Sequence, residues 1–158
     1  MTGRARAALP VIPPLSFAVR YDVATAGLPR RATLRRWVCA AQERELAVTL
    51  RFVGGREARR LNARYRGRDY ATNVLTFVYD DVVPLSGDIV LCVPVLVREA
   101  SSQRKTLRAH CAHLVIHGML HLQGYDHERS TDATRMEGRE IALLRALRYP
   151  DPYLIPLD

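Results

Sequence analysis

The sequence predicts an α+β fold: a single domain in which a mixed four-stranded sheet packs against helices. Two observations predict this fold. Strand and helix patterns alternate in the first half of the chain, whereas helix patterns fill most of the second half. The chain has 158 residues, of which 48% are hydrophobic and 25% are charged, as expected of one domain with its own core.

The predicted strands are marked by alternation of apolar and polar residues or by many β-branched and aromatic residues. They cover residues 15–23, 46–53, 73–79 and 88–93. The predicted helices, which show apolar residues at helical intervals, cover residues 29–45, 57–65, 94–124 in two pieces divided near Ser101 and Ser102, and 131–147. The order of the strands in the sheet does not follow from these patterns.

Proline-rich segments predict the limits of the domain. Residues 1–14 combine Pro, Ala and Arg without a clear period, so we expect a loose N-terminal leader. Residues 149–158 carry three prolines, so we expect a Pro-rich C-terminal tail. We therefore expect residues 15–148 to form a single domain.

The charge of the chain favours a polyanionic partner. The formal net charge is +8, and Lys105 is the only lysine. Arginine pairs with phosphate at two points and stays charged, so an excess of arginine suits binding to nucleic acid. A general preference for arginine over lysine explains the composition equally well.

The cysteines and the hydropathy indicate a reducing, non-membrane location. Cys39, Cys92 and Cys111 are odd in number and widely spaced, unlike the disulfide framework of a small secreted protein. No segment approaches the roughly 20 apolar residues that a membrane-spanning helix needs. We therefore expect a cytoplasmic protein without a membrane partner.

Three histidines carry the strongest chemical signal in the chain. On a helix, His117 and His121 leave the same face with Cβ atoms about 5–6 Å apart, so both imidazoles can reach one ion. Gly124 can take the left-handed conformation that ends the helix and reverses the chain, which returns His127 as a third ligand. Three imidazoles suit zinc and leave its fourth position open, as in catalytic sites. We expect one Zn²⁺ per chain, on a helix of the C-terminal half and the turn after it.

The spacing of these residues also matches the His-Glu-x-x-His-x-x-Gly-x-x-His signature of metzincin-type metalloproteases. The glutamate that serves those proteases as general base would be residue 118, which is Gly118. Peptide hydrolysis is therefore the weaker interpretation, although a bound metal could still activate water or polarise an oxyanion. Histidines that merely sit on an apolar helix are disfavoured, because three of them and the glycine occur at this spacing.

The neighbours of these histidines are candidates for supporting roles. His113 lies one turn before His117, but the distance from His113 to His121 spans two turns, about 12 Å, which is too long for ligation of one ion. We therefore expect His113 in a polar network beside the ligands. Asp126 could orient an imidazole, accept a proton or cap the turn, and support of a ligand is the commonest of these uses. We expect His110 on the helix surface.

Three segments of the chain resemble the bacterial YbeY family of zinc-dependent endoribonucleases and rRNA maturation factors. Residues 117–127, HGMLHLQGYDH, closely resemble the family's signature and are the most specific of the three. Residues 61–77 are similar to its LN..YR..D..T.VLSF block, and residues 87–89 to its GDI strand. The family often has Pro, Ser and Pro where this chain has Ala71, Thr76 and Val78, departures that concern the loop and not the metal site.

The resemblance implies a zinc ion held by His117, His121 and His127, and single-strand-specific cleavage of RNA in 16S rRNA maturation and ribosome quality control. The partners that it implies are rRNA, the small ribosomal subunit or its proteins, and a ribosome-assembly GTPase. The family's functional arginine maps onto Arg66, so the catalytic candidates are Arg66 and His117. Zinc and a guanidinium can together neutralise a scissile phosphate. The candidates for contact with the RNA backbone are Arg59, Arg64 and Arg68.

Two other functions stay open at this point. The first is a non-catalytic ribosome-assembly factor, in which zinc is structural and the positive charge binds rRNA. The second and weaker one is a metzincin-like metallopeptidase. Complementation of a deletion strain by folded zinc-site variants would favour the first, and turnover of a peptide panel would favour the second.

Overall fold

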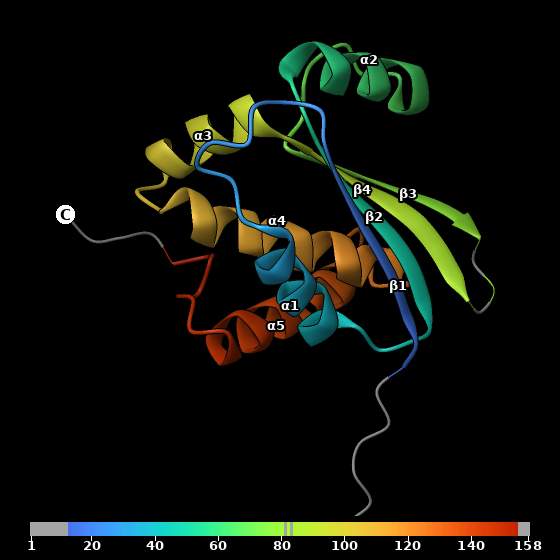
Figure 1. The fold of residues 1–158 in the computed structure, drawn as a ribbon. Coiled ribbons are helices and arrows are strands. Elements are labelled where there is room, and N and C mark those ends of the chain that lie inside the picture. Colours follow the sequence, from blue (N-terminus) through green and yellow to red (C-terminus); the bar gives the residue numbers. More distant parts are fainter. Residues whose placement is uncertain (1–12, 81, 83, 155–158) are drawn as a thin grey trace, which may run out of the picture.

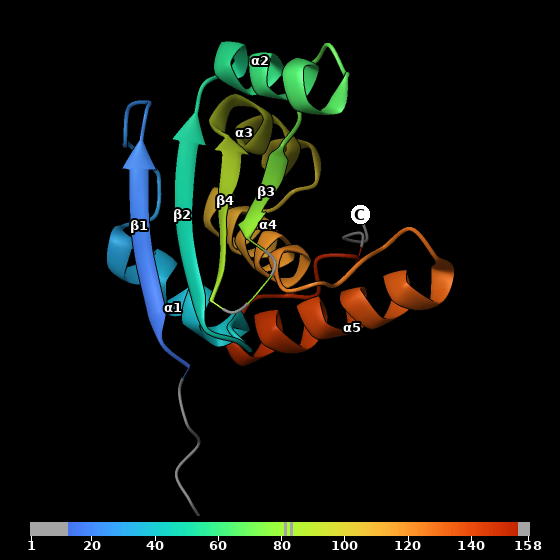
Figure 2. The same ribbon diagram turned by 90° about the vertical axis from the view of Figure 1, so that its right-hand side faces the viewer.

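Four strands form one mixed sheet, as predicted, and the structure gives their order as β1-β2-β4-β3 (Figure 2). The computed structural model describes residues 13–80, 82 and 84–154; most of the predicted leader and residues 155–158 of the predicted tail lie outside this range. β1 (Leu15–Tyr21), β2 (Leu46–Val53) and β4 (Leu85–Cys92) are parallel, and β3 (Val74–Asp80) pairs antiparallel with β4 at the edge. β3 is therefore an edge strand of the sheet.

Three helices cover one face of the sheet (Figure 1): α1 (Arg31–Ala41), α4 (Leu107–Leu122) and α5 (Ser130–Ala146). α4 lies at the centre of this layer, where it contacts α1, α5, β3 and β4. Its side chains are buried on several sides, which explains why its sequence is apolar all round rather than on one stripe. The core that it completes includes Trp37 of α1, Phe52 of β2 and Ile89 of β4, each fully buried.

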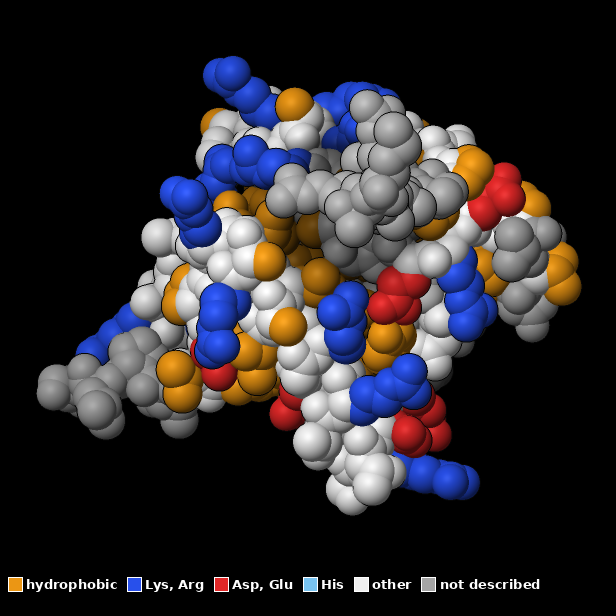
Figure 3. Space-filling view, turned by 90° about the horizontal axis from the view of Figure 1, so that it is seen from below, with side chains coloured by type: hydrophobic (Ala, Val, Ile, Leu, Met, Phe, Trp, Pro, Cys, Tyr) orange, Lys and Arg blue, Asp and Glu red, His pale blue; other side chains and the backbone are white. Residues whose placement is uncertain are grey.

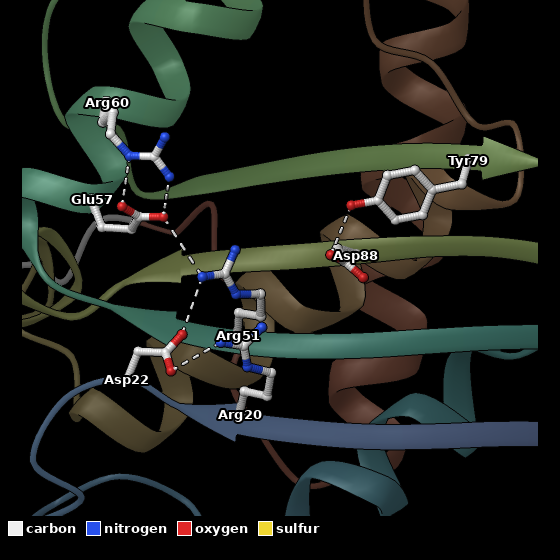
Figure 4. A network of polar contacts seen from close by, with 7 residues as sticks. All are labelled: Arg20, Asp22, Arg51, Glu57, Arg60, Tyr79 and Asp88. Carbon is white, nitrogen blue, oxygen red and sulfur yellow. Dashed lines mark hydrogen bonds and ion pairs between the residues drawn. The ribbon is translucent and has the colours of Figure 1, made fainter.

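The opposite face of the sheet is covered only at one end. There α2 (Gly55–Arg66) completes a second, smaller core with residues such as Leu61, Leu75 and Val90. α3 (Val93–Ser102) lies beyond the same end of the sheet, on the side of α4, and adds Val95 to this core (Figures 1 and 2). The remaining face is polar (Figure 4): Arg51 of β2 lies 3.1 Å from Asp22 and 3.7 Å from Glu57 of α2. Such a solvated face agrees with the alternation of polar and apolar residues along the strands.

The predicted elements are all present, and their ends show what local patterns miss. β2 has the predicted bounds, and the long helical region divides between residues 102 and 107, near the predicted break. β4 begins three residues earlier than predicted, because Leu85 and the residues after it pair with β2 from Leu46 onward. α1 is shorter than predicted, since Gln42 already lies beyond it with extended backbone.

Residues 149–154 of the predicted tail pack against the helices. The ring of Tyr149 lies 5.9 Å from that of Trp37, edge to face, and Lys105 Nζ donates a hydrogen bond of 2.7 Å to the carbonyl of Pro152. Among the described residues, no helix is long and apolar enough to cross a membrane.

Candidate metal centre

The structure brings together the three predicted metal ligands. His117 and His121 lie one turn apart on α4, and His127 lies in the segment between α4 and α5. One ligand nitrogen from each of the three imidazoles lies within 4.8 Å of the other two. Their ring centroids are 4.8–5.6 Å apart. The local geometry of a helix and one reversing turn is therefore sufficient to assemble the group.

The turn that returns His127 depends on a glycine and on a capping carboxylate. Gly124 has φ +100°, a conformation that L side chains rarely adopt, and its N–H donates to the carbonyl of His121. Asp126 Oδ1 accepts hydrogen bonds from the backbone N–H groups of His127, at 2.7 Å, and Glu128, at 3.2 Å. Of the three roles considered for Asp126, these contacts correspond to capping of the turn.

Gly118, at the position of the protease glutamate, faces the sheet rather than the histidines. A Cβ atom at this residue would lie 2.8 Å from Cγ2 of Ile89, closer than real Cβ atoms approach. Any longer side chain there would be pressed into β4. The packing of α4 on the sheet thus leaves no room for a glutamate at this point.

The three imidazoles fit a zinc ion by their chemistry. Burial lowers the pKa of His121, and the neighbouring His117 and His127 lower it further. A lower pKa keeps the ring neutral, with a lone pair available for a metal, to lower pH. A neutral nitrogen donor is the form that zinc binds, so the donor set fits this ion.

A buried carboxylate, missed by the sequence analysis, contacts one of these histidines. Glu140 of α5 is fully buried, and its Oε1 lies 2.6 Å from His117 Nδ1. Its Oε2 lies 3.0 Å from His113 Nε2 and also accepts a hydrogen bond from the Tyr153 hydroxyl. His113 therefore lies in a polar network beside the group, as we expected from its position in the sequence.

The three contacts govern the ionisation of Glu140. Burial disfavours its charged form, but the hydrogen bonds from His113, His117 and Tyr153 outweigh burial and lower its pKa to about 2. Burial and the carboxylate raise the pKa of Tyr153. Glu140 is thus an ionised acceptor at neutral pH. The signal for it in the sequence is an acidic residue four positions after Met136, on the buried stripe of α5.

Arg66 lines the same cavity as the three histidines. It is the last residue of α2, and its Nη2 donates a hydrogen bond of 2.9 Å to the carbonyl of Thr76 on β3. The cavity has a volume of roughly 590 Å³ and lies between this edge of the sheet and the end of α4. Its lining also includes Arg68, Asn73, Asp126 and Glu128. A cationic group and three potential metal ligands therefore face one space.

The three arginines predicted to contact an RNA backbone differ in position. Arg68 lines the cavity, whereas Arg59 and Arg64 are absent from its lining. Arg59 makes a two-point contact with Asp69, at 2.7 and 2.9 Å, and the Arg64 guanidinium lies 5.3 Å from the centre of the Tyr65 ring. Further basic side chains spread over the lower end of the molecule, where no histidine is visible (Figure 3). Positive charge is thus not confined to the cavity.

His110 is buried, and the expectation that it lies on the helix surface is wrong. Only 3% of it is exposed, and its Nε2 lies 3.0 Å from Glu99 Oε1. Glu99 also accepts a hydrogen bond from Asn73, a residue that lines the cavity. The reason is the central place of α4: α3 packs against the side of the helix that carries His110.

Comparison with known proteins gives the chain its family. The model of the family described as Endoribonuclease YbeY matches residues 30–148. A protein of Aromatoleum aromaticum named Endoribonuclease YbeY is 58% identical over 125 residues, which are 79% of this chain and 81% of that protein. A protein of the same name from Nitrosomonas eutropha is 52% identical over 137 residues, 87% of this chain and 97% of that protein.

The fold of the chain resembles a solved structure as well. The solution structure of a Thermotoga maritima protein matches with a TM-score of 0.56 and 24% identity, and the match covers 87% of this chain and 99% of that protein. This likeness concerns the fold, whereas the match to the family model extends across the three histidines, Arg66 and the buried helices. The chain belongs to the YbeY family of endoribonucleases.

Proposed function

We propose that this chain is a zinc-dependent endoribonuclease that cuts single-stranded RNA, with its catalytic centre in the cavity beside β3. One observation carries the proposal: three imidazole nitrogens lie within 4.8 Å of one another, and Arg66 lines the cavity that they face. The family name of the relatives supports RNA as the substrate class. The net charge of +8 supports a polyanionic substrate.

The ligand histidines and the arginines have separate tasks in this proposal. His117, His121 and His127 would hold the ion, which supplies positive charge to the phosphate and lowers the pKa of water. Arg66, fixed to the carbonyl of Thr76, and Arg68 bind the phosphodiester and stabilise the negative charge that grows in the transition state. Their side chains also hold the RNA backbone without reading its sequence.

The biological setting belongs to the same proposal. We place the activity in 16S rRNA maturation and ribosome quality control in the cytoplasm. The proposed partners are rRNA, the small ribosomal subunit or its proteins, and a ribosome-assembly GTPase. Few aromatic side chains are placed to stack bases in the cavity. Apart from the three histidines, Tyr70 is the sole aromatic residue among its described lining residues, so RNA shape or a protein partner would supply specificity.

The experiment measures metal content and RNA cleavage together. Wild type, His121→Ala and Arg66→Ala are compared on a single-stranded and a structured rRNA fragment, after circular dichroism has shown that each variant is folded. Arg60→Ala is the matched control, because Arg60 lies on α2 like Arg66 but pairs with Glu57 outside the cavity. We expect about one zinc per chain except in His121→Ala, and cleavage by wild type and the Arg60 variant alone.

Each other outcome points to a different function. Cleavage that persists in a zinc-free His121→Ala protein would refute a metal-dependent nuclease. Zinc bound by a wild type that cuts neither fragment would indicate the assembly factor with a structural zinc. Turnover of peptides would indicate the metalloprotease, which the packing of Gly118 against Ile89 disfavours.

A further inference from the structure

Glu140 stands apart from every other acidic residue that the structure describes, because it alone is fully buried. An ionised carboxylate loses several kcal/mol of hydration when it is buried, so it is retained only where close partners compensate it. Its partners here are His117, His113 and Tyr153, which come from α4 and from the C-terminal segment. The compensation thus involves one of the three residues of the candidate metal centre.

The contact between Glu140 and His117 determines which ring nitrogen is left for a metal. A carboxylate only accepts hydrogen bonds, so a neutral His117 must carry its proton on Nδ1, the atom 2.6 Å from Oε1. The lone pair of that tautomer lies on Nε2, on the other side of the ring. A histidine that is free to rotate would populate both tautomers and several ring orientations.

We propose that Glu140 is the positioning residue of this centre: it holds His117 as the Nδ1–H tautomer, with Nε2 turned toward His121 and His127. This inference rests on the proposed metal site. The ring centroids support it, since His117 lies 5.1 Å from His121 and 5.6 Å from His127 while its Nδ1 faces α5. The carboxylate also raises the basicity of the imidazole, which makes its Nε2 a stronger ligand for a metal.

The other two contacts keep Glu140 in place. Tyr153 and His113 both bind Oε2, which leaves Oε1 to His117. Tyr153 lies beyond α5, in a segment that is also tied to the start of α4 by the bond between Lys105 and Pro152. Residues 149–154 therefore help to hold His117 of α4 in place, because Tyr153 and His117 bind the same carboxylate.

The first test measures Zn²⁺ affinity by competition with a chromophoric chelator, on the full chain. We expect Glu140→Gln to weaken Zn²⁺ binding by about 10- to 100-fold and Tyr153→Phe by less than about tenfold, because the carboxylate remains there. Glu137→Gln, which removes an exposed charge from the same helix, should leave the affinity unchanged. An affinity of Glu140→Gln equal to that of wild type would overturn the positioning role.

The result that decides the second test is obtained on wild type, so it does not depend on how well Glu140→Gln folds. Nitrogen NMR of the metal-free wild type at about pH 8, above the usual pKa of histidine, reports the tautomer of each ring. We expect His117 as the Nδ1–H form in wild type and as a mixture in Glu140→Gln. An Nε2–H form of His117 in wild type would overturn the inference.

His121→Ala separates this inference from the function on which it rests. If His121→Ala binds Zn²⁺ as tightly as wild type, the metal centre itself is wrong. If His121→Ala loses Zn²⁺ but Glu140→Gln does not, the metal centre stands and only the role of Glu140 fails.

Discussion

Replacement of Gly118 by alanine tests the closest approach between α4 and the sheet. The added Cβ would lie 2.8, 3.1 and 3.2 Å from three side-chain carbons of Ile89, a fully buried residue of β4. Ordinary contacts between carbon atoms are about 3.5–4.0 Å, so α4 or Ile89 must move by several tenths of an ångström. Because His117 and His121 flank Gly118 on the same helix, such a movement would also disturb the metal centre.

Two opposing effects set the size of the change. Alanine is favoured over glycine in a helix interior by about 1 kcal/mol. Overpacking of a close-packed core costs about 1–3 kcal/mol. We therefore expect Gly118→Ala to lower the free energy of unfolding by up to about 2 kcal/mol. Gly138 of α5 provides the control, because a Cβ added there would meet no atom within 4 Å, so Gly138→Ala should raise the free energy of unfolding by about 0.5–1 kcal/mol.

Urea unfolding of the metal-free protein measures both variants, with the fluorescence of Trp37, the single tryptophan, as the signal. A double mutant then identifies the cause. Ile89→Ala alone should cost about 2–5 kcal/mol, but combined with Gly118→Ala the loss should be smaller than the sum by about 1–3 kcal/mol, since the clash is gone. Equal stabilisation by the two glycine replacements, or additive losses in the double mutant, would refute the close approach.

Three further predictions concern acid stability, an interhelix contact and metal binding. The pKa of Glu140 is lowered from 4.5 to about 2, so its ionised carboxylate stabilises the fold fully above about pH 4.5 and loses this effect as the pH falls toward 2. In urea unfolding of the metal-free protein, the free energy of unfolding of wild type should therefore fall by on the order of 3 kcal/mol more over this range than that of Glu140→Gln. An identical pH profile for wild type and variant would contradict it. Gln123 binds the backbone of Ala41, Glu43 and Arg44, so Gln123→Ala should cost about 2–4 kcal/mol in thermal unfolding, and a loss below about 0.5 kcal/mol would count against these bonds. Zinc at a hundred times its Kd should raise the free energy of unfolding of wild type by about 2.7 kcal/mol and leave that of His121→Ala unchanged. An equal increase in the two proteins would exclude this site.

Local patterns in the sequence were sufficient for much of the fold and for the histidine group. The apolar alternation of residues 46–53 predicts β2 with the bounds that the structure has. His117 and His121 lie on one face of α4 because a helix repeats every 3.6 residues, and Gly124 reverses the chain because it can adopt a positive φ. Each of these features depends only on residues a few positions apart, so it can be predicted from a short stretch of sequence.

The tertiary structure alone decided the strand order, the burial of His110 and the partners of the histidines. Glu140 meets His117 across two helices, and Arg66 reaches their cavity from a helix on the opposite face of the sheet. Both contacts join residues more than twenty positions apart, and they depend on how α2 and α4 pack on the sheet and how α5 packs on α4. The periodicity of one segment reports which of its faces is apolar, but not which other segment covers that face. The ligand spacing was therefore determined locally, whereas the residues that position a ligand or line the cavity were determined by packing.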